Sequence, residues 1–92
     1  MSISRLKIAI HGQVQGVFFR AEIQQIAEGL NLTGFAKNLD DGSVGVVAEG
    51  DKENLEKLLE WCHKGSDLAR VTKVESSWGE PIGEFEGFQV KY

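Results

Sequence analysis

Apolar residues along this chain recur with two periods, and the changes of period mark the predicted strands and helices. Leu6, Ile8 and Ile10 alternate with polar residues, which is typical of a half-buried strand. Gly12 and Gly16 interrupt this pattern, so we expect the strand to end before them. Further strands are expected at residues 33–39, 44–48 and 71–78, and alternation returns near the end of the chain in Phe88, Val90 and Tyr92.

Two segments show helical spacing instead. The apolar stripe of the first helix consists of Phe19, Ile23, Ile26, Ala27 and Leu30. Gly29 and Asn31 suit the end of this helix, where left-handed backbone is common. Asp51 is placed to cap the start of a second helix, and Gly65 is placed to end it. The stripe of this second helix consists of Leu55, Leu58, Leu59 and Cys62.

The predicted order of elements is β-α-β-β-α-β, with a hairpin turn at Asp40–Ser43 between the two middle strands. This order is that of the split βαβ, or ferredoxin-like, sandwich. We therefore predict an α+β fold in which two helices cover one face of a four-stranded antiparallel sheet. Residues 1–92 are expected to form a single domain.

Length, charge and cysteine content narrow the possible functions. The 92 residues are 41% hydrophobic and 26% charged, which is typical of one folded domain with a modest core. The formal net charge of −4 argues against a general nucleic-acid binder. The single cysteine, Cys62, can form no internal disulfide, and no apolar run reaches the roughly 18 residues of a membrane span. We expect a cytoplasmic monomer that binds neither nucleic acid nor membranes.

The segment between the first strand and the first helix, residues 12–20, carries the strongest candidate chemistry. Its glycines allow a tight turn that gathers several backbone N–H groups, and consecutive amides of this kind form an anion-binding nest. The positive end of the following helix and the two parallel donors of Arg20 strengthen such a site. Neither the nucleotide phosphate-loop motif nor the dinucleotide glycine motif is present, which disfavours nucleotides. A plain turn with a solvated Arg20 is the alternative.

Asn38 is the second candidate, because its side chain has a donor and an acceptor and can hold and orient a water molecule. The alternative is a turn-forming asparagine beside the hairpin. No set of His, Asp and Glu residues shows metal-ligand spacing, so we expect no metal. Structural or solvent-exposed roles are favoured for His11, Asp40, Asp41, Cys62 and His63.

Two segments resemble the signatures of the acylphosphatase family. The first is Gly12-x-Val14-Gln15-Gly16-Val17-x-Phe19-Arg20, which agrees at every fixed position. The second is Gly34-Phe35-Ala36-Lys37-Asn38-x-x-x-Gly42-x-Val44. The similarity extends over nearly the whole chain, and two departures, Asn31 and Ser66, lie in connections.

The resemblance implies a ferredoxin-like enzyme that hydrolyses the carboxyl–phosphate bond of acyl phosphates without a metal or an organic cofactor. It implies that Arg20 clamps the phosphoryl group and that Asn38 positions the attacking water. It also implies a phosphate-binding loop formed by Gln15, Gly16, Val17, Phe18, Phe19 and Arg20. The partners are then a small acyl phosphate and inorganic phosphate. Nothing in the sequence selects the acyl group, so broad specificity is expected, and the Phe18 side chain is assigned no role.

Two other classes of function stay open at this point. A non-catalytic phosphate-binding or regulatory acylphosphatase-like module would keep the loop as a receptor without turnover. A nucleic-acid-binding sandwich would use the sheet as its surface. The negative charge and the lack of an aromatic–basic strand disfavour this last class.

Overall fold

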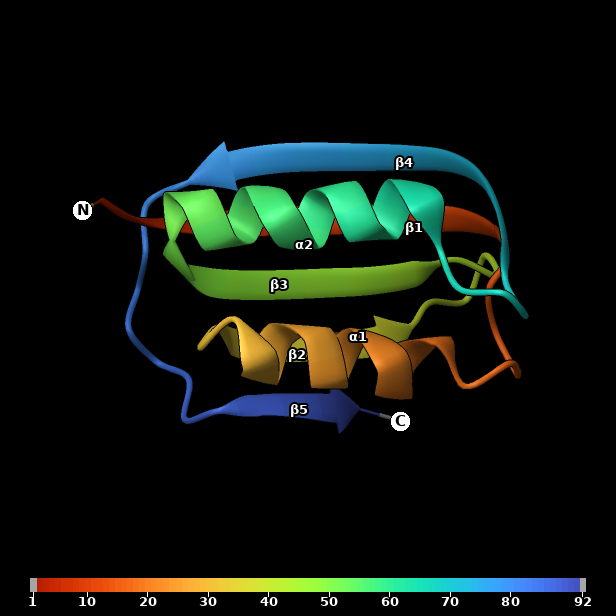
Figure 1. The fold of residues 1–92 in the computed structure, drawn as a ribbon, viewed down its shortest axis with the longest axis horizontal. Coiled ribbons are helices and arrows are strands. Elements are labelled where there is room, and N and C mark those ends of the chain that lie inside the picture. Colours follow the sequence, from red (N-terminus) through yellow and green to blue (C-terminus); the bar gives the residue numbers. More distant parts are fainter. Residues whose placement is uncertain (1, 92) are drawn as a thin grey trace.

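The computed structural model describes residues 2–91, and in it two helices cover one face of a five-stranded sheet (Figure 1). The elements are β1 (Ile3–Gln13), α1 (Phe19–Gly29), β2 (Thr33–Asn38), β3 (Val44–Asp51), α2 (Lys52–Lys64), β4 (Arg70–Gly79) and β5 (Phe88–Lys91). The strands lie in the order β4-β1-β3-β2-β5. This arrangement confirms the predicted α+β sandwich. Within residues 2–91, neither helix has the length and apolar character needed to cross a bilayer.

The prediction of four antiparallel strands is wrong, because β5 adds a fifth strand that runs parallel to β2. Its register extends from Gly34 opposite Phe88 to Lys37 opposite Lys91, whereas the other three strand pairs are antiparallel. A period of two shows that a segment is extended, but it does not show which strand the segment joins. Tyr92, the last residue of the predicted alternation, lies outside the described residues.

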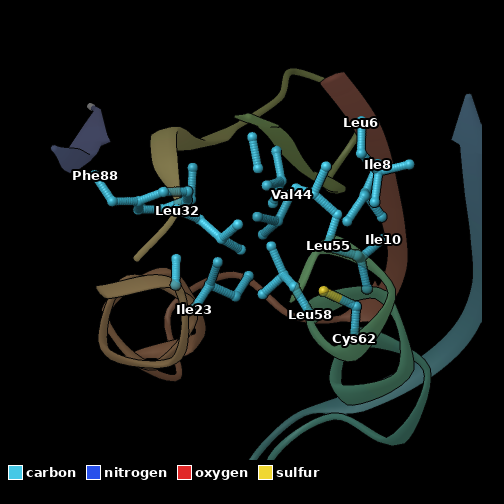
Figure 2. Close-up of a cluster of buried hydrophobic side chains, with 14 of the residues drawn as sticks. Leu6, Ile8, Ile10, Ile23, Leu32, Val44, Leu55, Leu58, Cys62 and Phe88 are labelled. Carbon is cyan, nitrogen blue, oxygen red and sulfur yellow. The ribbon is translucent and has the colours of Figure 1, made fainter. Parts of the chain in front are cut away.

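Alternation along the strands decides which face the helices cover. Leu6 and Ile10 on β1 and Val44 on β3 are completely buried beneath the helices. In Figure 2 the side chains of Ile23 from α1 and of Leu55 from α2 converge on the same region. Burial of each leucine or isoleucine contributes about 1.5–3 kcal/mol. The core therefore fixes both helices against the sheet, and the predicted core positions are confirmed.

The sequence predicted capping residues at three helix ends, which are the two ends of α2 and the end of α1. Asp51 caps α2, since its Oδ1 accepts a hydrogen bond from the backbone N–H of Glu53 at 3.1 Å. Gly65 ends this helix with a φ of 74°, as predicted. After α1, Asn31 has the expected left-handed backbone with a φ of 56°. Gly29 does not, because it is still the last residue of the helix.

The first strand does not end before the glycines, because β1 continues to Gln13. A shift of register against β4 between His11 and Gly12 makes this extension possible. Gly12 has a φ of 128°, and a Cβ atom built on it would lie 2.0 Å from the carbonyl oxygen of Arg70. Glycine is therefore required here for the close approach of β1 and β4.

The substitution Gly12→Ala is expected to lower the free energy of unfolding by about 2–4 kcal/mol, because the new methyl group overlaps the β4 backbone and the φ is strained. Gly42→Ala is the matched control. Its φ is also positive, at 92°, but no atom lies within 4 Å of the added Cβ, so only the conformational cost of about 1–2 kcal/mol applies. Urea titration measures both variants, and equal losses would contradict the overlap.

A buried carboxylate holds the long connection between β4 and β5. Glu49 on β3 is 4% exposed. It accepts hydrogen bonds from Arg5 Nη1 at 2.7 Å and from the backbone N–H groups of Ile82 at 2.8 Å and Gly83 at 3.0 Å. Burial alone would raise the pKa of Glu49, but the two backbone donors and Arg5 outweigh it and lower this pKa from 4.5. Glu49 thus fixes the path of the chain toward β5.

The variant Glu49→Gln is expected to lose about 2–4 kcal/mol of stability at neutral pH, because charge-assisted bonds in a buried site are lost. The lowered pKa means that this stabilisation is fully present above the unfolded pKa of Glu49, and is lost as the pH falls through the folded pKa. Denaturant midpoints followed through the acid range should therefore fall less steeply for the variant than for the wild type. Glu84→Gln is the control, because Glu84 is an exposed partner of Arg5 at 3.6 Å. It should keep the wild-type acid slope.

Candidate functional site

Residues 14–18 join β1 to α1 and present a row of backbone N–H groups. Gly16 has a φ of 75° and Phe18 has a φ of 62°, so left-handed backbone occurs twice within three residues. Within residues 2–91, no carbonyl or side chain accepts a hydrogen bond from the amides of residues 15–18. Amides gathered in this way form a nest for an anion, next to the positive end of α1.

Phe18 occupies the N-cap of α1 in a left-handed conformation that aromatic residues rarely adopt. Its φ is 62° and its ψ is 18°, and its side chain makes no capping hydrogen bond. This conformation costs about 1–2 kcal/mol, and such strain is concentrated at ligand-binding sites. The Phe18 side chain remains 77% exposed.

The Gln15 side chain ties this loop to the β2–β3 hairpin. Its Nε2 donates hydrogen bonds to the carbonyl oxygens of Leu39 at 2.8 Å and of Ser43 at 2.9 Å. The hairpin is closed by Asp41, whose Oδ1 accepts bonds from the Ser43 hydroxyl at 2.5 Å and the Ser43 N–H at 3.0 Å. Both bonds lower the pKa of Asp41, and the bond from the Ser43 hydroxyl has the larger effect. The predicted turn role of Asp41 is confirmed, and the loop is held against the end of β2.

Asn38 is the last residue of β2, and Leu39, which follows it, is bonded to Gln15. The Asn38 Oδ1 is buried and accepts no hydrogen bond from any residue between 2 and 91. A buried acceptor without a partner costs about 1–3 kcal/mol, and native proteins keep few of them. This oxygen is therefore a candidate acceptor for a proton of a bound molecule.

Arg20 lies in the first turn of α1 and is held by the last strand. Its Nη1 donates to the carbonyl oxygen of Lys91 at 2.6 Å. One turn later, Gln24 Nε2 donates to the carbonyl oxygen of Phe88 at 3.0 Å. The helix thus bonds β5 at two points. Arg20 also lines a hollow of about 380 Å³, together with Gly16 of the loop.

The structure brings most of the predicted site residues together. Gly16, Phe18, Phe19 and Arg20 line the hollow beside the loop. The ring of Phe19 is buried and stacks on Trp61 with the ring centroids 5.5 Å apart, so it belongs to the core. Asn38 does not line this hollow and is connected to the loop through Gln15 and the hairpin.

Cys62, His11 and His63 were also considered in the sequence, and none of them lines the hollow. Cys62 is fully buried, and this burial raises the pKa of its thiol to about 12. His11 Nε2 lies 2.8 Å from Glu75 Oε1, and His63 is exposed in the last turn of α2. Across the described part of the chain, no three or more His, Cys, Asp or Glu side chains are grouped to hold a metal ion.

Three contacts of the site were not predicted from the sequence. They are the Gln15 side-chain bonds, the Gln24 bond to β5 and the support of Arg20 by the Lys91 carbonyl. Every residue has a backbone carbonyl, so the sequence does not show which distant carbonyl accepts from a glutamine or arginine side chain. The bonds of Gln24 and Arg20 depend on the place of β5 beside β2, and those of Gln15 depend on the place of the β2–β3 hairpin beside the loop.

Comparison with known proteins covers nearly the whole chain. The family model described as Acylphosphatase matches residues 6–90. An acylphosphatase from Pelotomaculum thermopropionicum is 42% identical over 92 residues, which are 100% of both chains. An acylphosphatase from Thermococcus kodakarensis is 49% identical over 86 residues, which cover 94% of this chain and 93% of that one. The crystal structure of acylphosphatase from Bacillus subtilis has a TM-score of 0.91 at 32% identity and covers 99% of this chain and 100% of that chain.

Proposed function

This chain belongs to the acylphosphatase family, and on that premise we propose that it hydrolyses small acyl phosphates to a carboxylate and inorganic phosphate. One observation carries the assignment of the site. The amides of residues 15–18, which have no partner among residues 2–91, adjoin a hollow lined by Arg20. Backbone N–H groups and a guanidinium are suitable donors for the oxygens of a phosphoryl group.

In the proposed reaction, a water oxygen attacks phosphorus and forms a new P–O bond. The bond from phosphorus to the acyl oxygen breaks, and its electron pair leaves on the carboxylate. The proton of the water passes to a phosphate oxygen. Because a carboxylate is a good leaving group, no strong general acid is needed. Catalysis then depends on positioning and on stabilising the charge of the equatorial oxygens.

The loop amides, Arg20 and Asn38 have separate roles in the proposed reaction. The loop amides and Arg20 bind the phosphoryl oxygens, as preorganised donors that need no rearrangement during the reaction. The Lys91 carbonyl, which accepts from Arg20 Nη1, supports the guanidinium in the hollow. Asn38 Oδ1 accepts a hydrogen bond from the attacking water, which accounts for a buried acceptor without a protein partner among residues 2–91. We propose that no metal or organic cofactor takes part.

The test is hydrolysis of acetyl phosphate in oxygen-18-labelled water with an excess of chelator. We expect turnover that the chelator does not reduce, and the label should appear in phosphate. Recovery of the label in acetate would contradict attack at phosphorus, and loss of activity with the chelator would contradict a metal-free reaction. Phosphate binding seen by calorimetry without any turnover would support the non-catalytic module instead. That alternative is not favoured by the similarity to named acylphosphatases.

We also propose that the chain acts as a single-domain monomer in the cytoplasm. Sedimentation velocity at the concentration used for kinetics measures this directly. A dimer that loses activity on dilution would contradict it.

A further inference from the structure

The Gln15 side chain joins the loop to the hairpin that follows Asn38. The backbone of Gln15 belongs to the row of N–H groups at residues 15–18, whereas its side chain reaches the β2–β3 hairpin, at the same end of the sheet (Figure 1). Both hydrogens of Nε2 are used, because this atom donates to the carbonyl oxygen of Leu39 at 2.8 Å and to that of Ser43 at 2.9 Å. One side chain thus links segments that lie 24 and 28 positions apart.

The two acceptors fix the backbone directly after Asn38. The Ser43 carbonyl also accepts a hydrogen bond from the Leu39 N–H at 2.8 Å, and this N–H belongs to the peptide bond that joins Asn38 to Leu39. Gln15 therefore holds Leu39 at both ends, directly at its carbonyl and through Ser43 at its N–H. The backbone that carries the Asn38 side chain is thus fixed relative to the loop.

We propose that the Gln15 side chain is a positioning residue for the reaction, which sets the distance and direction from the loop amides to the buried Asn38 Oδ1. It thereby places the attacking water relative to the phosphoryl group. The inference rests on the proposed function and makes it more specific. The sequence placed Gln15 in the phosphate-binding loop and gave its side chain no role.

The link matters because the two reactants are held by different parts of the chain. In the proposed complex the loop and Arg20 bind the phosphoryl group, whereas Asn38 holds the water. A misplacement of about 1 Å can lower a rate about 100-fold, even when the change lies away from the reacting atoms. Loss of the link should therefore slow the attack and leave phosphate binding nearly unchanged, since the amides and Arg20 are retained.

The experiment is a double-mutant cycle on kcat for acetyl phosphate with Gln15→Met and Asn38→Ala. Methionine keeps the length of the side chain but has no N–H donor. Gln15→Met alone is expected to lower kcat about 10- to 100-fold and to change the inhibition constant of phosphate by about threefold or less. In the Asn38→Ala background, Gln15→Met should lower kcat by about threefold or less, because the water is no longer held.

Asp41→Ala approaches the same link from the hairpin. Asp41 is exposed, and its Oδ1 accepts the two Ser43 bonds that close the turn. The variant should loosen the segment that carries the Ser43 carbonyl. We expect a smaller loss of kcat than in Gln15→Met, which should again nearly vanish in the Asn38→Ala background. A loss that is the same in both backgrounds would contradict the link.

Asn54→Leu is the matched control, because Asn54 is also a partly buried side-chain amide that donates to a distant carbonyl, that of Leu30 at 3.1 Å. It should leave kcat unchanged in both backgrounds. Equal losses of kcat for Gln15→Met in the two backgrounds, or weaker phosphate inhibition with an unaltered kcat, would overturn the inference and leave the proposed function intact. A wild-type protein that does not hydrolyse acetyl phosphate would reject the proposed function and this inference with it.

Discussion

Replacement of Arg20 by alanine should lower kcat/KM for acetyl phosphate about a thousandfold, through both a higher KM and a lower kcat. The guanidinium offers parallel charge-assisted bonds to the phosphoryl oxygens, each worth about 1.5–3 kcal/mol. Loss of a single preorganised donor to a developing negative charge typically costs a factor of about 100–1,000. Steady-state kinetics, with inorganic phosphate as a competitive inhibitor, measures the loss of binding and the loss of rate separately.

Two further arginine variants sharpen this prediction. Arg20→Lys keeps the charge but not the planar fork, so its activity should lie between those of the wild type and Arg20→Ala. Arg70→Ala removes an exposed arginine that does not line the hollow and should keep wild-type rates. A folded Arg20→Ala variant with nearly wild-type kcat/KM would exclude Arg20 from the phosphoryl site.

Replacement of Asn38 by alanine should lower kcat about a hundredfold or more, while KM and inhibition by phosphate change little. The reason is that Asn38 is assigned to the attacking water and not to the phosphoryl group. Its buried Oδ1 has no hydrogen-bond donor among residues 2–91. Single-turnover measurements with saturating enzyme test the chemical step directly.

The matched control is Asn54→Ala. Asn54 is a partly buried asparagine whose Nδ2 donates to the carbonyl oxygen of Leu30 at 3.1 Å, and it does not line the hollow. It should reduce stability slightly and leave kcat unchanged. If Asn38→Ala raised KM and left kcat intact, Asn38 would be a binding residue and the assignment of the water would be wrong.

The features that were correctly predicted from the sequence are local ones. Asp51 caps the residue two positions ahead, and Asp41 closes a turn through Ser43. In each case a short polar side chain meets its own neighbouring backbone, so the sequence contains both partners side by side. The same holds for the turn between β1 and α1, where the left-handed Gly16 and the following helix adjoin, while the binding of phosphate by this turn stays a prediction.

The features that were missed join residues far apart in the chain. Glu49 bonds Ile82 and Gly83, and the parallel pairing of β5 with β2 depends on the path that these bonds fix. From the sequence alone, a glutamate such as Glu49 is expected to lie on the surface. Its burial could not be predicted, because its partners are backbone groups of a distant loop. The side-chain chemistry made Arg20 and Asn38 candidates, the family resemblance gave them their catalytic roles, and these roles stay predictions until the variants are measured.

The bond between Arg20 and the Lys91 carbonyl joins positions 71 residues apart, and this separation has a consequence for biosynthesis. Both signature motifs lie within residues 12–44, so they are translated well before β5. The arginine nevertheless reaches its support only after the last strand has left the ribosome and paired with β2. The role proposed for Arg20 therefore predicts that a chain truncated before residue 91 carries every signature residue, lacks the Lys91 carbonyl that accepts from Arg20, and is less active.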